Sequence, residues 1–142
     1  MRHIKDINQR LRSSGLKPTK QRIQLSKILF ESKNTFHFTV LDLKKMIEEK
    51  LQEKISLATV YNTVHVFQKK GYIKKILLDT NKSYYDTNVK DHHHFFDEGS
   101  QTLKDIDQDK IKISTMPLSP TSKKIKSVEV LIRLENDNQK SK

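Results

Sequence analysis

Three consecutive histidines, His92–His94, form the densest group of candidate metal ligands in this chain of 142 residues. Imidazole nitrogen binds zinc, manganese, iron and haem iron, and the following Phe95 and Phe96 would offer apolar surface to a planar macrocycle. If this stretch is a strand, its first and third histidines point to one face and the second to the other. The stretch therefore predicts two ligand sites, or one site built on a turn.

A structural role for the same histidines stays open. Carboxylates that could pair with them without any ligand are close in the sequence, at Asp86, Asp91 and Asp97. Cysteine is absent, which excludes disulfides, thiolate zinc sites, cysteine nucleophiles and cysteine-ligated haem. Any haem response must therefore rest on histidine.

A helix predicted for residues 56–71 carries the second polar group. Its apolar stripe consists of Val60, Val64 and Phe67. Ser56 can cap the first turn, and Gly71 suits the left-handed residue that ends a helix. One side of this helix should therefore be buried.

The face opposite this stripe is polar and contains no carboxylate. It carries Ala58, Asn62, His65 and Lys69, with Tyr61 on its flank. An amide that can pair with adenine, a phenol, an imidazole and an ammonium suit contact with nucleic acid, because nothing on this face repels phosphate. An ordinary solvated helix face is the alternative.

The formal charge of +11 is concentrated in the first part of the chain. Residues 1–90 hold 19 Lys and Arg against 8 Asp and Glu, whereas residues 91–142 hold 9 against 9. This asymmetry favours a basic module for nucleic acid or an anionic surface, followed by a neutral module with another role. No apolar run approaches the roughly 18 residues of a membrane span, and Met1–Asp6 has no apolar signal region. We therefore expect a cytoplasmic protein without membrane association.

Helical periodicity predicts further helices at residues 4–14, 19–32 and 39–51. Thr19 can cap the second of these, and a Thr39/Asp42 capping box opens the third. Residues 34–38 are predicted as a loop. The helices at 39–51 and 56–71, joined by a short turn, form a helix-turn-helix arrangement.

Extended structure follows Gly71. Residues 72–78 and 83–86 predict a β-hairpin, which in this position is the wing of a winged helix. Its lysines could reach a sugar-phosphate backbone. They are Lys74, Lys75 and Lys82.

The second module is shorter and less regular. We expect strands at 102–107 and 124–134, a helical turn within 107–113, a proline loop at 115–120 and a disordered tail at 136–142. About 45 residues are too few for a stable core, so self-association is expected. A dimer would place two recognition helices about one turn of DNA apart, which matches an inverted repeat.

Together these stretches resemble the ferric uptake regulator (Fur) family over about residues 10–135. The resemblance rests on Leu16–Thr19, Ala58–Tyr61 and His92–His94, in this order. Within the family, the chain looks most like the iron response regulator (Irr) branch. The stretches that carry this finer likeness are Tyr61–Thr63, Tyr84–Asn88, Asp91–Phe96 and Val128–Leu134.

The resemblance implies an α+β protein that regulates transcription as a repressor or activator of iron and haem genes. Residues 1–88 would be a winged helix-turn-helix DNA-binding domain, and residues 89–135 a small α+β dimerisation and effector-sensing domain. Lys17 would enter the minor groove, and Tyr61 and Asn62 would contact bases of an A·T-rich inverted repeat. The expected DNA-binding residues are Lys17, Thr59, Tyr61, Asn62, His65, Lys69, Lys74 and Lys75.

The resemblance also implies an effector site at the hinge between the two domains. The family's divalent metal site (Fe, Mn or Zn) falls on His37, Asp86 and His93, while Phe95 stands where the family has its remaining ligand. A haem contact would fall on His92, His93 and His94. The cysteine-ligated structural zinc of the family is excluded.

Two other classes of function compete with this interpretation. A histidine-based metal or haem carrier would need no specific DNA contact. An enzyme has little support, because the chain has only three glycines and no phosphate-binding loop. The Ser14–Lys17 stretch fits a Ser-x-x-Lys nucleophile pattern only by chance.

Overall fold

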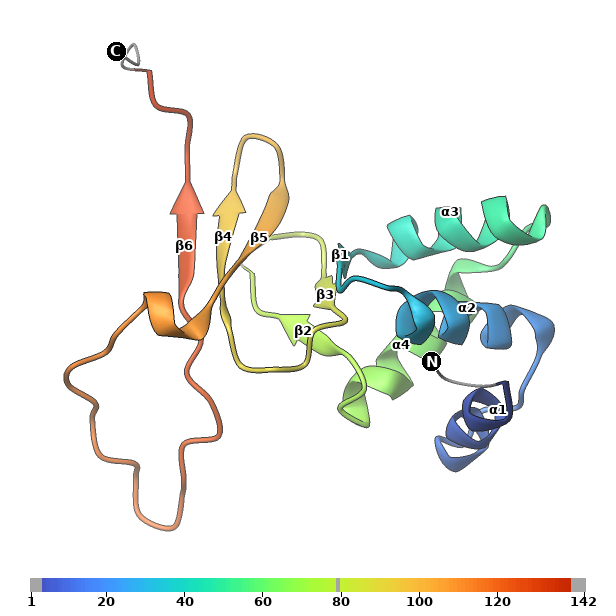
Figure 1. Ribbon diagram of the computed structural model, residues 1–142, viewed down its shortest axis with the longest axis horizontal. Coiled ribbons are helices and arrows are strands. Elements are labelled where there is room, and N and C mark those ends of the chain that lie inside the picture. Colours follow the sequence, from blue (N-terminus) through green and yellow to red (C-terminus); the bar gives the residue numbers. More distant parts are fainter. Residues whose placement is uncertain (1–3, 79, 139–142) are drawn as a thin grey trace. The chain divides into compact units, whose positions relative to one another are not determined.

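The structure, a computed structural model, describes residues 4–78 and 80–138. The chain divides into two compact units, the first ending at Val89 and the second beginning at Lys90. Within the described residues, the first unit contains four helices and a small sheet, and the second contains another small sheet (Figure 1). The predicted mixed α+β class is confirmed.

The helices of the first unit form where the sequence pattern predicts them. They are α1 (Ile4–Ser13), α2 (Lys20–Glu31), α3 (Val40–Leu51) and α4 (Leu57–Lys69). Thr19, Thr39 and Ser56 cap α2, α3 and α4, each accepting a hydrogen bond from the backbone N–H three residues on. The cap of α3 is reciprocal, because Asp42 accepts from the Thr39 N–H at 2.9 Å. Gly71 has φ 78°, the predicted left-handed conformation.

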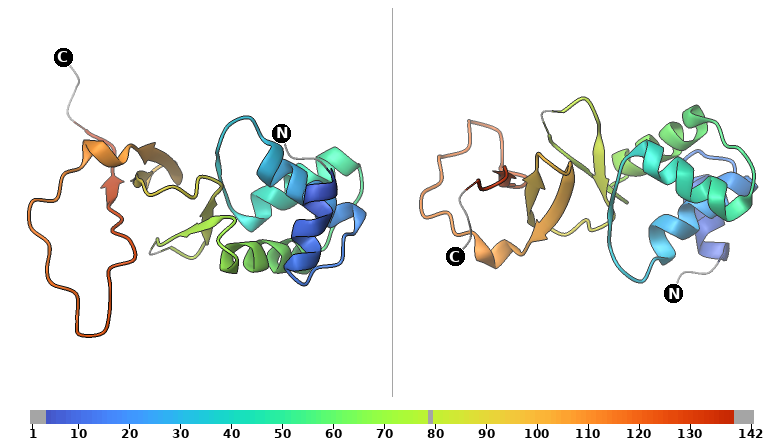
Figure 2. Two further views of the ribbon diagram at one scale, coloured as in Figure 1. Left: turned by 60° about the horizontal axis from the view of Figure 1, so that its bottom comes forward. Right: turned by 90° about the horizontal axis from the view of Figure 1, so that it is seen from above.

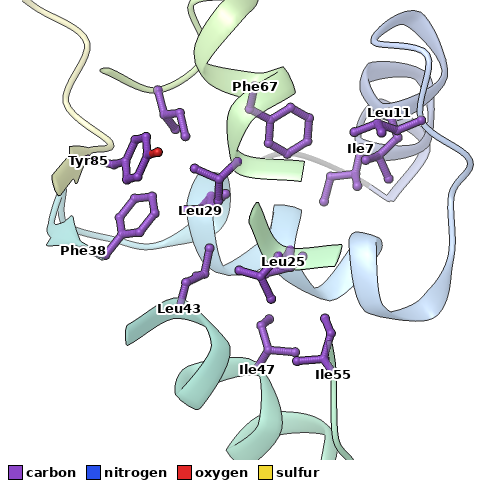
Figure 3. Packing of buried hydrophobic residues seen from close by; sticks show 14 residues of the cluster. Ile7, Leu11, Leu25, Leu29, Phe38, Leu43, Ile47, Ile55, Phe67 and Tyr85 are labelled. Carbon is purple, nitrogen blue, oxygen red and sulfur yellow. The ribbon is translucent and has the colours of Figure 1, made fainter. Parts of the chain in front are cut away.

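Side chains from all four helices pack into one apolar core (Figure 3). Leu25 and Leu29 of α2 are at most 3% exposed. Burying each such side chain contributes roughly 1.5–3 kcal/mol relative to leaving it in water. Further core residues of the helices, at most 1% exposed, are Ile7, Leu11, Leu43, Ile47, Val60, Val64 and Phe67.

The sheet of the first unit has the antiparallel order β1-β3-β2, with β1 at His37–Phe38, β2 at Lys74–Ile76 and β3 at Tyr84–Asp86. The predicted hairpin is confirmed, although its strands are shorter than expected. The predicted loop at residues 34–38 is wrong for His37 and Phe38. Two residues carry no readable periodicity, and their pairing comes from the distant Tyr85 and Asp86.

The second unit contains β4 (His93–Asp97), β5 (Thr102–Ile106), the short helix η1 (Gln108–Lys110) and β6 (Leu131–Leu134). The order is β5-β4-β6, with β6 parallel to β4. The strand predicted at 102–107 is confirmed for 102–106, and the helical turn and the loop at 115–120 are confirmed.

The strand predicted at 124–134 is wrong for residues 124–130. Only Leu131–Leu134 pair with β4, through its residues His94–Asp97. Strand β4 begins at His93, one residue before the first of these pairs, so it could pair with at most one more residue of a longer β6. Of the predicted disordered tail, residues 136–138 have no regular secondary structure and residues 139–142 lie outside the described part.

None of the helices in the described ranges has the length and hydropathy of a membrane span.

Replacing Thr39 by alanine should lower the free energy of unfolding of the first unit by about 1 kcal/mol. The change removes one hydrogen bond of the reciprocal cap of α3. Urea unfolding followed by the helical circular dichroism signal measures this loss. The matched control is Thr35→Ala, an exposed threonine outside the helices; equal destabilisation by both changes would contradict the role of the cap.

Candidate functional site

Helix α4 buries one side and exposes the other. Val60, Val64 and Phe67 are 0% exposed, whereas Tyr61 is 52% exposed. The predicted polar face is the exposed one. Its residues Ala58, Asn62 and Lys69 are exposed, and His65 is half-buried.

The Tyr61 ring is held by its neighbour one turn further along the helix. It stacks on His65 with a centroid distance of 5.7 Å and an interplanar angle of 9°. Residues at i and i+4 share a helix face, so this contact needs no distant partner. The stacking places the phenol on the exposed face in a restricted set of rotamers, which reduces the entropy lost when a ligand is bound.

The turn between α3 and α4 is fixed by Glu48. Its Oε2 accepts hydrogen bonds from the Lys44 ammonium at 2.9 Å and from the Ile55 N–H at 3.0 Å. These two hydrogen bonds, first that from Lys44, lower the pKa of the Glu48 carboxyl. Gln21 of α2 also donates to the Lys54 carbonyl at 3.2 Å, so the start of α4 has a defined place on the helical core.

A groove of about 650 Å³ lies beside Tyr61, between the starts of α3 and α4 and the turn of the β2–β3 hairpin. Its apolar lining includes Leu41, 54% exposed, and Leu57, 46% exposed. Tyr85 also lines it, and burial raises the pKa of the Tyr85 phenol, with Tyr61 adding to the effect. Sequence reasoning missed Leu41 as a lining residue of this groove, because the groove is formed by segments that lie far apart in the chain.

The remaining predicted DNA contacts differ in how accessible they are. Lys17 and Lys75 are exposed, and Lys74 is half-buried on β2. The Thr59 hydroxyl lies 2.7 Å from that of Ser56, inside the cap of α4. The Thr59 hydroxyl is therefore used in the cap at the start of α4.

In the first unit, the structure brings the predicted ligands His37 and Asp86 together. They are cross-strand partners on β1 and β3, with 3.2 Å between His37 Nε2 and Asp86 Oδ2. Asp86 is 0% exposed, and its Oδ1 accepts from the Asn88 N–H at 2.9 Å. The carboxylate is thus held in one orientation, with its other oxygen toward the histidine.

In the second unit, His92 and His94 converge on Asp105 of β5. Their Nε2 atoms lie 3.2 and 3.3 Å from the same oxygen, Oδ1 of Asp105. The two rings have centroids 4.4 Å apart, as expected for alternate residues on one face. One donor atom from each of these three residues lies within 4.8 Å of the other two.

The hydrogen bonds of His92 show which of its ring nitrogens carries a proton. Its Nδ1 lies 2.6 Å from the Lys90 carbonyl oxygen, which can only accept, so Nδ1 carries a proton. A neutral His92 therefore turns the lone pair of Nε2 toward the carboxylate of Asp105. Either a second proton or a bound cation relieves this contact, and a backbone carbonyl on Nδ1 is the usual outer partner of a metal-bound histidine.

His93 takes the opposite tautomer and does a different task. Its Nδ1 accepts from the Val130 N–H at 2.9 Å, which leaves the proton of the neutral ring on Nε2. The hydrogen bond attaches the chain just before β6 to β4. The histidine triplet therefore divides between two faces, and His93 does not join His92 and His94.

The aromatic residues after the triplet do not form an open platform. Phe96 is 3% exposed and Phe95 is half-buried. The imidazole nitrogens of His92 and His94 instead face a carboxylate. Such a mixed nitrogen and oxygen donor set suits manganese, iron or zinc.

A family model described as Ferric uptake regulator family matches residues 13–134 of the chain. The chain is 33% identical over 91 residues to the ferric uptake regulation protein of Vibrio parahaemolyticus, covering 63% of this chain and 59% of that protein. It is 30% identical over 103 residues to the peroxide operon regulator of Bacillus subtilis, covering 72% and 69%. The match thus spans less than two thirds of the length of the Vibrio relative.

Solved structures share the fold at low sequence identity. The ferric uptake regulator from Pseudomonas aeruginosa with manganese has a TM-score of 0.66 and 17% identity, covering 93% of this chain and 98% of that one. The Helicobacter pylori regulator Fur, described with three functional metal binding sites, has a TM-score of 0.64 and 19% identity, covering 94% and 92%.

Glu48→Gln should destabilise the turn between α3 and α4 in a pH-dependent way. Because the pKa of Glu48 is lowered in the folded state, its carboxylate stabilises the fold at neutral pH, and this contribution is lost as the pH falls through the folded pKa. The difference in unfolding free energy between wild type and variant should therefore shrink in acid. Glu49→Gln, the exposed neighbour, is the control; a pH-independent difference for Glu48→Gln would contradict the assignment.

Proposed function

The chain belongs to the ferric uptake regulator family, and from this membership we propose that it is a dimeric transcription regulator that binds specific DNA and responds to a divalent metal ion. The matched relatives are named as regulators, which favours this function over a histidine-based carrier and over an enzyme. The Irr resemblance adds the finer proposal that the target genes serve iron and haem homeostasis.

The observation that carries the proposal is the exposed face of α4. Residues 56–71 contain no carboxylate, and their apolar side is fully used by the core. Tyr61 and Asn62 are the exposed groups suited to base edges, since an amide can pair with adenine in the major groove. Lys69 and Lys75 are exposed cations suited to phosphate.

The groove beside Tyr61 supports a preference for A·T pairs. Leu41, Leu57 and Ala58 give it apolar lining next to the base-reading residues. Apolar side chains discriminate thymine through its methyl group in the major groove. Lys82, at the hairpin turn, also lines this groove and offers a phosphate a cation beside the base-reading residues.

For the metal, we propose His92, His94 and Asp105 as ligands in the second unit. Three donor atoms converge there, and the Nδ1 hydrogen bond of a neutral His92 turns the Nε2 lone pair toward Asp105, where a cation would bind both. His93 is left out of this set because Val130 holds its Nδ1. In the first unit, the pair His37 and Asp86 stays proposed as metal-ligating on the family resemblance.

Haem is the less favoured effector. A haem would need an open apolar surface beside an available imidazole, whereas Phe96 is buried and the paired histidines face a carboxylate. A metal ion would instead supply positive charge between His92, His94 and Asp105, and so hold β4 and β5 together.

Tyr61→Ala should remove sequence preference while leaving most of the salt dependence. We expect a loss of about 1–3 kcal/mol on a duplex selected from a random library, and little change on random duplex.

Lys74→Ala with Lys75→Ala should instead lower the slope of log K against log salt by about 1 for each phosphate that is no longer neutralised. Fluorescence anisotropy at several salt concentrations measures both.

The control for this experiment is Lys33→Ala, an exposed lysine outside α4 and the hairpin, which should change neither quantity. If Tyr61→Ala weakened binding to the selected and the random duplex equally, Tyr61 would have no part in base readout.

His92→Ala and Asp105→Asn should each weaken Mn(II) binding by more than about tenfold, since even the outer partners of metal ligands are worth about 10–100-fold. Titration calorimetry of the full chain measures the affinity, and His37→Ala tests the pair of the first unit in the same way. Asp107→Asn, two residues after Asp105 and exposed, is the matched control. A haem Soret shift that depends on His92, with no Mn(II) binding, would reverse the choice of effector.

A further inference from the structure

In the second unit, the acidic and the basic side chains lie in different parts of the sequence. Residues 91–109 contain six carboxylates and one lysine, whereas residues 110–128, here called the basic segment, contain five lysines and no carboxylate. The balanced total of residues 91–142 conceals this separation. The five lysines are Lys110, Lys112, Lys123, Lys124 and Lys126.

The lysines of the basic segment are not used inside the protein. All five are exposed, and within the described residues none of their ammonium groups takes part in an ion pair. Three of the nearby carboxylates have other partners. Asp97 accepts from the N–H groups of Gly99 and Ser100, Asp105 faces the histidines, and Glu98 lies 4.0 Å from Arg133.

The basic segment contains one hydrogen-bonded turn. Pro117 and Pro120 keep it out of helix and strand, and it runs as a long connection from η1 to β6 (Figure 2). At the turn, the Lys123 N–H donates to the Pro120 carbonyl at 3.0 Å, and the Ser119 hydroxyl donates to the Lys123 carbonyl at 2.6 Å. This turn directly precedes Lys124 and Lys126 in the chain.

We propose that the basic segment binds the phosphate backbone of double-stranded DNA, in addition to the base-reading contacts of α4. This inference rests on the proposed function. Duplex DNA carries one negative charge per about 1.7 Å, so lysines spread along an extended segment can each neutralise a phosphate. Once α4 is bound, the segment meets DNA at a high effective concentration, so weak individual contacts suffice.

An anionic membrane is the less favoured partner. The segment does expose Ile113, Met116, Leu118 and Ile125. Insertion at a membrane surface uses an amphipathic helix, which gathers such side chains on one face. Apart from Lys110, the last residue of η1, the segment has no helix, so its apolar groups form no such face.

The test replaces all five lysines by glutamine and, in a matched control, all five by arginine. Of the five lysines, only Lys110, the last residue of η1, lies in a helix or strand, so both variants should keep the fold, which circular dichroism checks. On the selected and the random duplex, the glutamine variant should lower the slope of log K against log salt by about 0.9 for each phosphate that is no longer neutralised, so by at least about 2 in total. The arginine variant should keep the wild-type slope, because the charge is unchanged.

An unchanged slope for the glutamine variant, with the selectivity dependent on Tyr61 intact, would overturn this inference and leave the proposed function standing. Wild-type protein that binds neither duplex would overturn both. Co-sedimentation with phosphatidylserine vesicles that is lost in the glutamine variant, together with an unchanged DNA slope, would replace DNA by a membrane as the partner.

Discussion

Burial of Val60, Val64 and Phe67 fixes the rotation of α4 about its own axis, and the polar face that the helix exposes depends on that rotation. A shift of one residue turns the helix by about 100°, which would expose part of this stripe and bury polar groups such as Asn62. The loss would be about 1.5–3 kcal/mol for each apolar side chain exposed. The cap at Ser56 and the turn held by Glu48 determine where the helix starts. The face is therefore preorganised before any partner arrives.

In the second unit, the register between β4 and β5 determines which side chains meet. Pairing of His94 with Asp105 places the carboxylate beside the alternate histidines, and a slip of one residue would move it to the opposite face. The central His93 then necessarily points away, where it accepts the Val130 N–H and attaches the last strand. One tripeptide thus places the two histidines proposed as cation ligands on one face of β4 and a structural acceptor on the other.

The sequence predicted well what depends on neighbouring residues. The caps at Thr19, Thr39 and Ser56, the stripe of α4 and the left-handed Gly71 are all confirmed, because each depends on residues within one or two turns. It missed what depends on pairing across the chain. Strand β1, the groove beside Tyr61 and the short β6 all require a distant partner to be known.

The carboxylate that faces the histidines also could not be identified from the sequence alone. Asp91 and Asp97 are nearer to the triplet in sequence than Asp105, yet Asp97 is used to close the turn after β4. Asp105 reaches His92 and His94 only because β5 folds back on β4.

A divalent ion at His92, His94 and Asp105 would add positive charge to a unit whose residues 91–142 contain 9 basic and 9 acidic side chains. Since screening weakens such a charge beyond about 8 Å at physiological salt, its main effect would be on the nearby strands β4 and β5.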